Sequence, residues 1–231
     1  MKFLKYLLLL ISIHIYAADT IKSYVLIGQN YAQQTIGSNL FQDVAIKRKL
    51  MSFSALVDFK EFQFYASYKH SPYQQIGSGT LNNDVQIDFF QKAYQLETGF
   101  SRKFYLSDNF FIAPALIYFH TAQHNTKKIS IQEIQKKKVD QDLRPYLYMR
   151  YRVFKSTVLY TNIQLDNDLT SNDNETEYNQ YPFSIALYQS ITPKIFLHIQ
   201  YQQNLKDRPI FGSEISDKQS KIYTLGIGFE F

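Results

Sequence analysis

Large apolar residues alternate with small or polar ones along most of the chain. The pattern is clearest at the C-terminus, where five large apolar residues lie two apart: Tyr223, Leu225, Ile227, Phe229 and Phe231. In a β-strand this spacing places all five on one face. Ten segments share the pattern, at approximately residues 22–33, 44–58, 61–70, 85–103, 110–121, 143–154, 157–166, 180–190, 194–205 and 220–231. It predicts an all-β protein, with a bulge at Phe89-Phe90, where the alternation changes phase.

The connections between these segments alternate between long and short. The long ones are residues 34–43, 71–84, 122–142, 167–179 and 206–219. The alternation places every long loop at one end of the sheet and both termini at the other, which requires an even number of strands. Short turns at one end and long loops at the other are typical of transmembrane barrels. We therefore expect a transmembrane antiparallel up-and-down β-barrel of ten strands, with eight or twelve as alternatives. The competing fold is a soluble sandwich or a lipocalin-like barrel.

Residues 1–18 have the features of a secretory signal peptide. Lys2 and Lys5 precede an apolar run, and Tyr16-Ala17-Ala18 offers a cleavage site. The run is too short to span a bilayer, which disfavours a membrane anchor, and no later segment has 18 consecutive apolar residues. The expected organisation is a signal peptide at 1–18 and an outer-membrane β-barrel domain at 19–231.

The composition excludes several kinds of site. The 231 residues include no cysteine, which removes disulfides, thiolate metal sites and cysteine nucleophiles. The net charge of +5 is not concentrated on any predicted face, so nucleic acid is not an expected partner. We expect no cofactor and no metal.

The last nine residues, from Tyr223 to Phe231, resemble the C-terminal signature of bacterial outer-membrane β-barrel proteins. Those proteins commonly end in a strand of alternating apolar residues that finishes on Phe. The resemblance implies recognition by the barrel-assembly machinery and insertion into a Gram-negative outer membrane. It names a class of proteins and no specific family.

If the apolar positions face lipid, the alternate positions face the lumen. The lumen candidates are Arg48, Lys69, Glu97, Arg144, Arg150, Arg152, His198 and Glu230. One interpretation is a charge-paired, hydrogen-bonded plug. The other is a narrow porin-like channel for small anionic solutes, lined by the five cations of this set.

Two external segments carry further candidates. Residues 122–142 include five lysines, which suit an extended strand pair, a solvated loop or contact with lipopolysaccharide phosphates. Residues 166–177 are rich in carboxylates but lack the spacing and the glycine of a calcium loop. An exposed acidic loop is therefore expected there.

No catalytic motif is present: the chain has neither Gly-x-Ser-x-Gly nor His-Glu-x-x-His. We expect a non-enzymatic, monomeric outer-membrane barrel that contacts lipid and lipopolysaccharide. Its external loops bind at the surface, or its narrow lumen is largely plugged. The enzymatic alternative is a rim hydrolase, an omptin-like protease or a lipase. It would pair His120 or His124 with Asp84, Asp142 or Asp166.

Overall fold

The computed structural model describes residues 23–38, 41–80, 85–165, 183–204, 208–209 and 215–231. Every regular element within those ranges is a β-strand. No helix in the described part of the chain is long and apolar enough to cross a membrane. The expected signal peptide at 1–18 lies outside the described residues.

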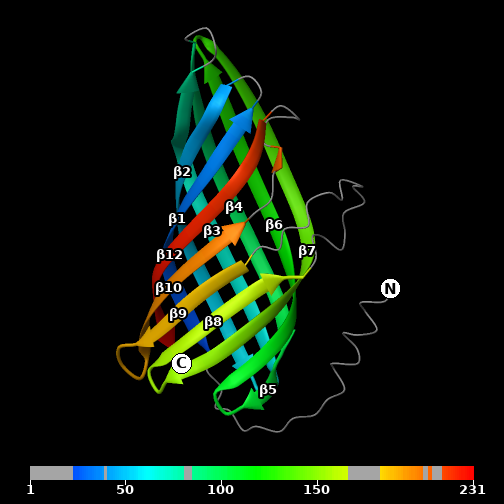
Figure 1. The fold of residues 1–231 in the computed structure, drawn as a ribbon, viewed down its shortest axis with the longest axis vertical. Coiled ribbons are helices and arrows are strands. Elements are labelled where there is room, and N and C mark those ends of the chain that lie inside the picture. Colours follow the sequence, from blue (N-terminus) through cyan, green and yellow to red (C-terminus); the bar gives the residue numbers. More distant parts are fainter. Residues whose placement is uncertain (1–22, 39–40, 81–84, 166–182, 205–207, 210–214) are drawn as a thin grey trace, which may run out of the picture.

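Ten long antiparallel strands form a closed barrel over the described residues (Figure 1). They are β1 (Tyr24–Ser38), β2 (Phe41–Phe59), β3 (Phe62–Thr80), β4 (Gln86–Arg102), β6 (Phe110–Ile129), β7 (Gln132–Phe154), β8 (Thr157–Gln164), β9 (Phe183–Ser190), β10 (Ile195–Asn204) and β12 (Ile215–Glu230). Each pairs with its neighbours in this order, and β12 returns to pair with β1. Two short pieces, β5 (Phe104–Ser107) and β11 (Arg208–Pro209), pair with β6 and β12. The predicted ten-strand barrel is confirmed.

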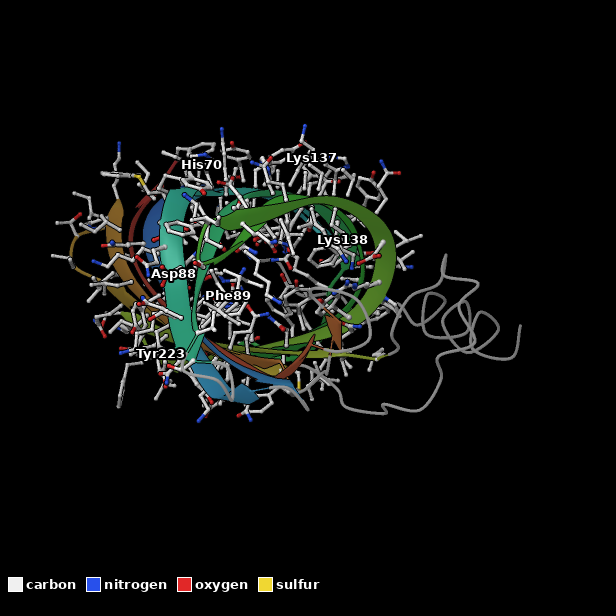
Figure 2. The ribbon with its side chains drawn as sticks, turned by 90° about the horizontal axis from the view of Figure 1, so that it is seen from above. His70, Asp88, Phe89, Lys137, Lys138 and Tyr223 are labelled. Atoms are coloured by element: carbon white, nitrogen blue, oxygen red, sulfur yellow. The ribbon has the colours of Figure 1, made fainter. Side chains whose placement is uncertain are left out.

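The two faces of the sheet are the reverse of those in a soluble barrel. Large apolar side chains such as Ile27, Phe53 and Leu225 are exposed on the outside. Small and polar side chains such as Ser52, Ser67 and Gln91 are buried inside. Viewed along the barrel, Tyr223, His70 and Lys137 point outward, whereas Phe89 and Lys138 point inward (Figure 2). An apolar outer belt of this kind is stable only against lipid, which excludes the soluble alternatives.

The wall of the barrel is taller on one side than on the other (Figure 1). Strands β2, β3, β4, β6 and β7 contain 17 to 23 residues, whereas β8 and β9 contain 8 each. A tilted strand of about 9–11 residues crosses a membrane. The short strands approach this length, whereas the long ones exceed it and continue beyond the membrane.

The long connections differ from the prediction, because much of 34–43, 71–84 and 122–142 is strand. β6 and β7 run up to a two-residue turn at Ser130-Ile131, where Ser130 has a φ of 53°. Above the membrane both faces of a strand meet water, so neither face needs to be apolar. The hydrogen bonds between the strands continue there, but the alternation of apolar residues that predicts a strand is lost. Extension of this strand pair was one of the alternatives considered.

The expected bulge also lies elsewhere. Strand β4 keeps one phase throughout, with Ile87, Phe89 and Gln91 all buried. The register shifts fall opposite it in β3, between Ser71 and Gln74 and between Gln75 and Gly77. An extra residue on β3 leaves the partner strand undisturbed.

Both chain ends of the barrel lie at the end with the short turns. The backbone N–H of Phe231 donates to the carbonyl of Ser23 at 2.9 Å. Just inside this end the ring of Phe196 lies against Gly228, where a Cβ would come within 1.9 Å of the ring. Gly228 thus allows an aromatic side chain to lie flat on the inner wall.

Candidate functional site

The upper lumen contains a cavity of about 340 Å³ whose lining comes from all ten long strands. It extends from Tyr24 and Tyr188 up to Lys138, which is exposed at the outer rim. Because inward positions on neighbouring strands lie side by side in register, residues distant in sequence converge here. The cavity is the main candidate site.

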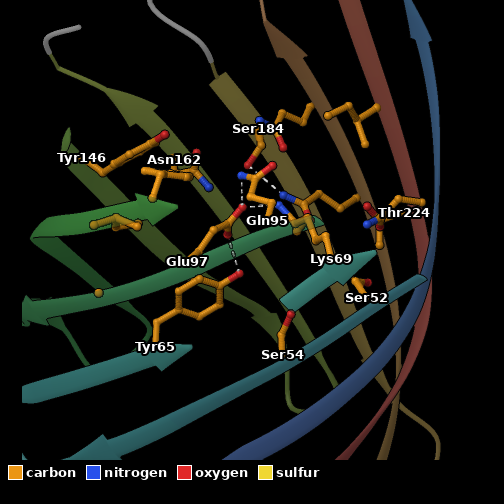
Figure 3. Close-up of a pocket in the computed structure, with 18 of the residues that line it drawn as sticks. Ser52, Ser54, Tyr65, Lys69, Gln95, Glu97, Tyr146, Asn162, Ser184 and Thr224 are labelled. Atoms are coloured by element: carbon orange, nitrogen blue, oxygen red, sulfur yellow. Dashed lines mark hydrogen bonds and ion pairs between the residues drawn. The ribbon is translucent and has the colours of Figure 1, made fainter. Parts of the chain in front are cut away.

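Glu97 is the centre of a hydrogen-bonded network in the middle of the cavity (Figure 3). Its carboxylate forms an ion pair with Lys69. It also accepts hydrogen bonds from Tyr65 Oη at 3.1 Å and from Gln95 Nε2 at 2.7 Å. The register of β3 and β4 places Lys69 opposite Gln95, which brings these groups together. A buried carboxylate with this many donors is held rigidly.

A second network lies nearer the outer rim. Arg48 Nη1 donates to Gln91 Oε1 at 2.6 Å, and Gln91 Nε2 donates to Asn125 Oδ1 at 2.6 Å. On the neighbouring strand β7, Arg144 forms an ion pair with Asp142, two residues earlier in the chain, and its guanidinium carbon lies 4.8 Å from the centroid of the Phe119 ring. The lumen cations are thus bound to neighbouring side chains.

Three tyrosines form a floor beneath the cavity, here called the tyrosine floor: Tyr24, Tyr160 and Tyr188. The hydroxyls of Tyr24 and Tyr188 are 3.3 Å apart, and the ring centroids of Tyr160 and Tyr188 are 4.8 Å apart. These three residues line both the upper cavity and a second, smaller space of about 50 Å³ below it. They therefore lie between the two spaces.

The smaller space lies at the end with the short turns. Beside it, Lys103 and Asp58 form a buried ion pair whose side chains are 2% and 9% exposed. Gln63 Nε2 donates to Asp58 at 3.4 Å, and the Lys103 ammonium lies 5.4 Å from the Tyr105 ring centroid. The end with the short turns therefore contains a buried pair of opposite charges.

All eight predicted lumen residues border one of these two spaces. Arg48, Lys69, Glu97, Arg144 and His198 line the upper cavity. Arg150, Arg152 and Glu230 line the lower space. The five cations predicted to line a passage are thus divided by the tyrosine floor. The five apolar residues of the C-terminal signature, Tyr223, Leu225, Ile227, Phe229 and Phe231, are exposed on the outer face.

The sequence prediction missed the floor and the buried ion pair. Tyrosine is common on either face of a strand, so its identity does not show which way it points. The only signal is position: Tyr24 is next to the outward-facing Val25, and Tyr188 is next to the outward-facing Leu187, so both tyrosines should point inward. Lys103 lies at the break between β4 and β5, where the alternation is interrupted and cannot assign a side chain to the inner or the outer face.

The histidines of the hydrolase alternative lie on the outer surface. His120 Nδ1 is 3.3 Å from Gln141 Nε2, and His124 Nε2 is 3.3 Å from Gln135 Oε1. Asp142 is paired with Arg144 inside the barrel. Asp84 and Asp166 lie outside the described residues, as does the acidic segment 166–177. The described residues contain no cluster of three or more His, Asp or Glu side chains that suits a metal ion.

Comparison with known proteins shows likeness at the level of the fold. No protein-family model and no curated protein sequence matches the chain. The crystal structure of the outer membrane protease OmpT from Escherichia coli matches with a TM-score of 0.58 and 10% identity, over 95% of this chain and 99% of that chain. The transport unit of the autotransporter AIDA-I from Escherichia coli matches with a TM-score of 0.55 and 8% identity, over 96% and 94%. With its closed sheet and apolar belt, the chain is an integral outer-membrane β-barrel protein.

Proposed function

We propose that the protein is a non-enzymatic outer-membrane barrel that does not conduct and that offers an outward-opening binding cavity. The tyrosine floor is the observation that carries the proposal. It lies between the upper cavity and the lower space, and its rings pack on one another and on Phe196. A ligand entering from outside would be stopped there.

The paired charges of the lumen support the same function. A conducting lumen needs groups that hold a solute loosely enough to release it. Here Lys69 is bound to Glu97 and Arg144 to Asp142. Such groups stabilise a filled interior rather than guide ions.

Planar-bilayer conductance tests the proposal. We expect the purified protein to be electrically silent, and the Tyr160→Ala/Tyr188→Ala variant to open stepwise currents, because the floor loses two of its three rings.

Tyr201→Ala is the matched control, because Tyr201 stacks on Tyr223 of the neighbouring strand, where Tyr223 is exposed on the outer face. Removing that ring should leave the barrel silent. Steady currents through the unmodified protein would contradict the closed lumen.

The non-enzymatic part is supported by the positions of His120 and His124, whose described partners are amides on the outer surface. Among the described residues, neither histidine has the carboxylate partner that the omptin-like pairing requires. Incubation with peptide and phospholipid substrates should give no cleavage. Activity that disappears in His120→Ala or His124→Ala would establish the hydrolase instead.

We also propose lipopolysaccharide as a partner, through one row of outward side chains. Lys92 of β4 pairs in register with His124 of β6, which pairs with Lys137 of β7. The row lies just beyond the stacked rings of Tyr94 and His120, which are 5.9 Å apart. Aromatic girdles mark membrane interfaces, so this row is at the right height for headgroup phosphates.

A further inference from the structure

We propose that the upper cavity binds an uncharged, hydroxyl-rich molecule of the size of a mono- or disaccharide. The inference deepens the proposed function and rests on it in one respect, namely that the cavity is entered from the outer rim. It concerns the chemistry of the ligand, which the closed floor does not specify.

Tyrosine rings and amide side chains together make up 16 of the 39 lining residues. Six tyrosines take part: Tyr24, Tyr65, Tyr146, Tyr148, Tyr160 and Tyr188. Ten amides accompany them: Asn30, Gln63, Gln91, Gln95, Gln123, Asn125, Asn162, Gln164, Gln200 and Gln202. An amide both donates and accepts hydrogen bonds, as does a hydroxyl, and a ring face packs on the C–H face of a sugar. A cavity of about 340 Å³ falls within the range of small-molecule sites.

The charged groups favour a neutral ligand over an anion. Lys69 is paired with Glu97, Arg144 with Asp142, and Arg48 donates to Gln91. An anion would have to displace these partners and leave buried carboxylates unpaired, which is costly. A neutral ligand leaves the networks intact.

One wall of the cavity carries polar atoms without a hydrogen-bond partner among the described residues. Both ring nitrogens of His198 are unpaired, although the residue is only 2% exposed, and so is Oδ1 of the buried Asn30. Gln200, two residues beyond His198, pairs with Thr224, which also pairs with Asn30. The unpaired atoms therefore lie on the same patch of β10, β12 and β1.

The chemistry of these atoms selects hydroxyl groups. A neutral imidazole has one nitrogen that donates and one that accepts, and the amide oxygen of Asn30 accepts. A carboxylate or phosphate oxygen only accepts, so it would leave two of the three atoms unpaired. Hydroxyls both donate and accept, so they can pair with all three atoms.

Isothermal titration calorimetry of the folded barrel in detergent tests the proposal, with maltose, glucose and glucose 6-phosphate as probes. We expect saturable binding of maltose or glucose and weaker binding of glucose 6-phosphate. His198→Phe keeps a ring of similar shape and removes both nitrogens, so sugar affinity should fall by about tenfold, the cost of unmade hydrogen bonds. His120→Phe makes the same change on the outer surface and should bind like the unmodified protein.

A shift in gel mobility on heating reports whether each variant is folded. If His198→Phe does not fold, Asn162→Leu removes another polar lining group at constant size and should weaken sugar binding in the same direction. Absence of binding to both neutral sugars, or binding of glucose 6-phosphate alone, overturns the inference. Neither outcome touches the proposed function, which fails only if the unmodified barrel conducts or cleaves substrate.

Discussion

At the scale of single residues, the lumen is organised by buried charges that have partners. Asp58 and Lys103 illustrate the principle at the periplasmic end. Burying an ion pair is close to neutral in free energy, because the attraction between the charges offsets the loss of hydration. Removing one partner leaves the other charge buried alone, which is strongly destabilising. The barrel is therefore stable only when this end is folded so that Asp58 and Lys103 meet.

We predict that Lys103→Met lowers the free energy of unfolding by about 3–5 kcal/mol. The double variant Asp58→Asn/Lys103→Met should recover part of that loss, because no unpaired charge remains. Urea unfolding of the barrel in lipid vesicles measures both.

The control is Lys128→Met. Lys128 and Glu133 are 3.7 Å apart, and their side chains are 44% and 41% exposed. The loss of this surface pair should cost less than about 1 kcal/mol. Equal effects of the two single variants would show that the Asp58–Lys103 pair is not desolvated as the structure indicates.

At the scale of elements, the tall strands give the molecule its outer surface. Strands β4, β6 and β7 continue past the lipid, so one face of the sheet changes from apolar to basic along the same strands. Their antiparallel register aligns Lys92, His124 and Lys137 in one row. No single stretch of sequence contains this row.

We predict that Lys92→Gln/Lys137→Gln weakens lipopolysaccharide binding at least tenfold, since each lysine near an anionic surface contributes about 1 kcal/mol. The increase in melting temperature on adding lipopolysaccharide measures the affinity. Lys155→Gln, in the turn between β7 and β8 at the opposite end, should leave that increase unchanged. An undiminished increase in the double variant would remove the row as the binding surface.

At the scale of the whole molecule, closure depends on the two terminal strands. Fifteen residue pairs join β1 to β12, from Tyr24 and Glu230 to Ser38 and Ile215. Closure removes both sheet edges, which lipid could not hydrogen-bond. The side chain of Phe231 projects outside this pairing and is 74% exposed.

We therefore predict that Phe231→Ala reduces insertion into the outer membrane more than it reduces the stability of the folded barrel. The free energy of unfolding of the purified barrel should fall by at most about 1–3 kcal/mol, the contribution of one apolar side chain transferred from water to an apolar environment. Insertion in cells should fall severalfold if the assembly machinery reads the terminal Phe. The amount of folded barrel in outer-membrane fractions measures insertion, and Val153→Ala on another strand is the control. Equal insertion of both variants would exclude that role.

The sequence by itself predicted a barrel of ten strands, with eight or twelve as alternatives. The alternation of apolar residues determined the lipid-facing side and the inward position of residues such as Arg48, Glu97 and His198. This was possible because alternate residues of a membrane-spanning strand face lipid on one side and the lumen on the other, so apolar and polar residues alternate in the sequence. The alternation failed above the membrane, where both faces of a strand meet water. The extended hairpins were therefore partly interpreted as loops.

Only the tertiary structure decided which inward residues meet. Register brings Lys69 of β3 to Glu97 of β4. Barrel closure brings Tyr24 of β1 to Tyr188 of β9, although these two strands are far apart in sequence. Period two fixes the face of a residue, but not its height along the barrel relative to another strand. In the structure, the predicted lumen cations lie at two heights. Arg48, Lys69 and Arg144 line the upper cavity, Arg150 and Arg152 line the lower space, and the tyrosine floor lies between the two groups.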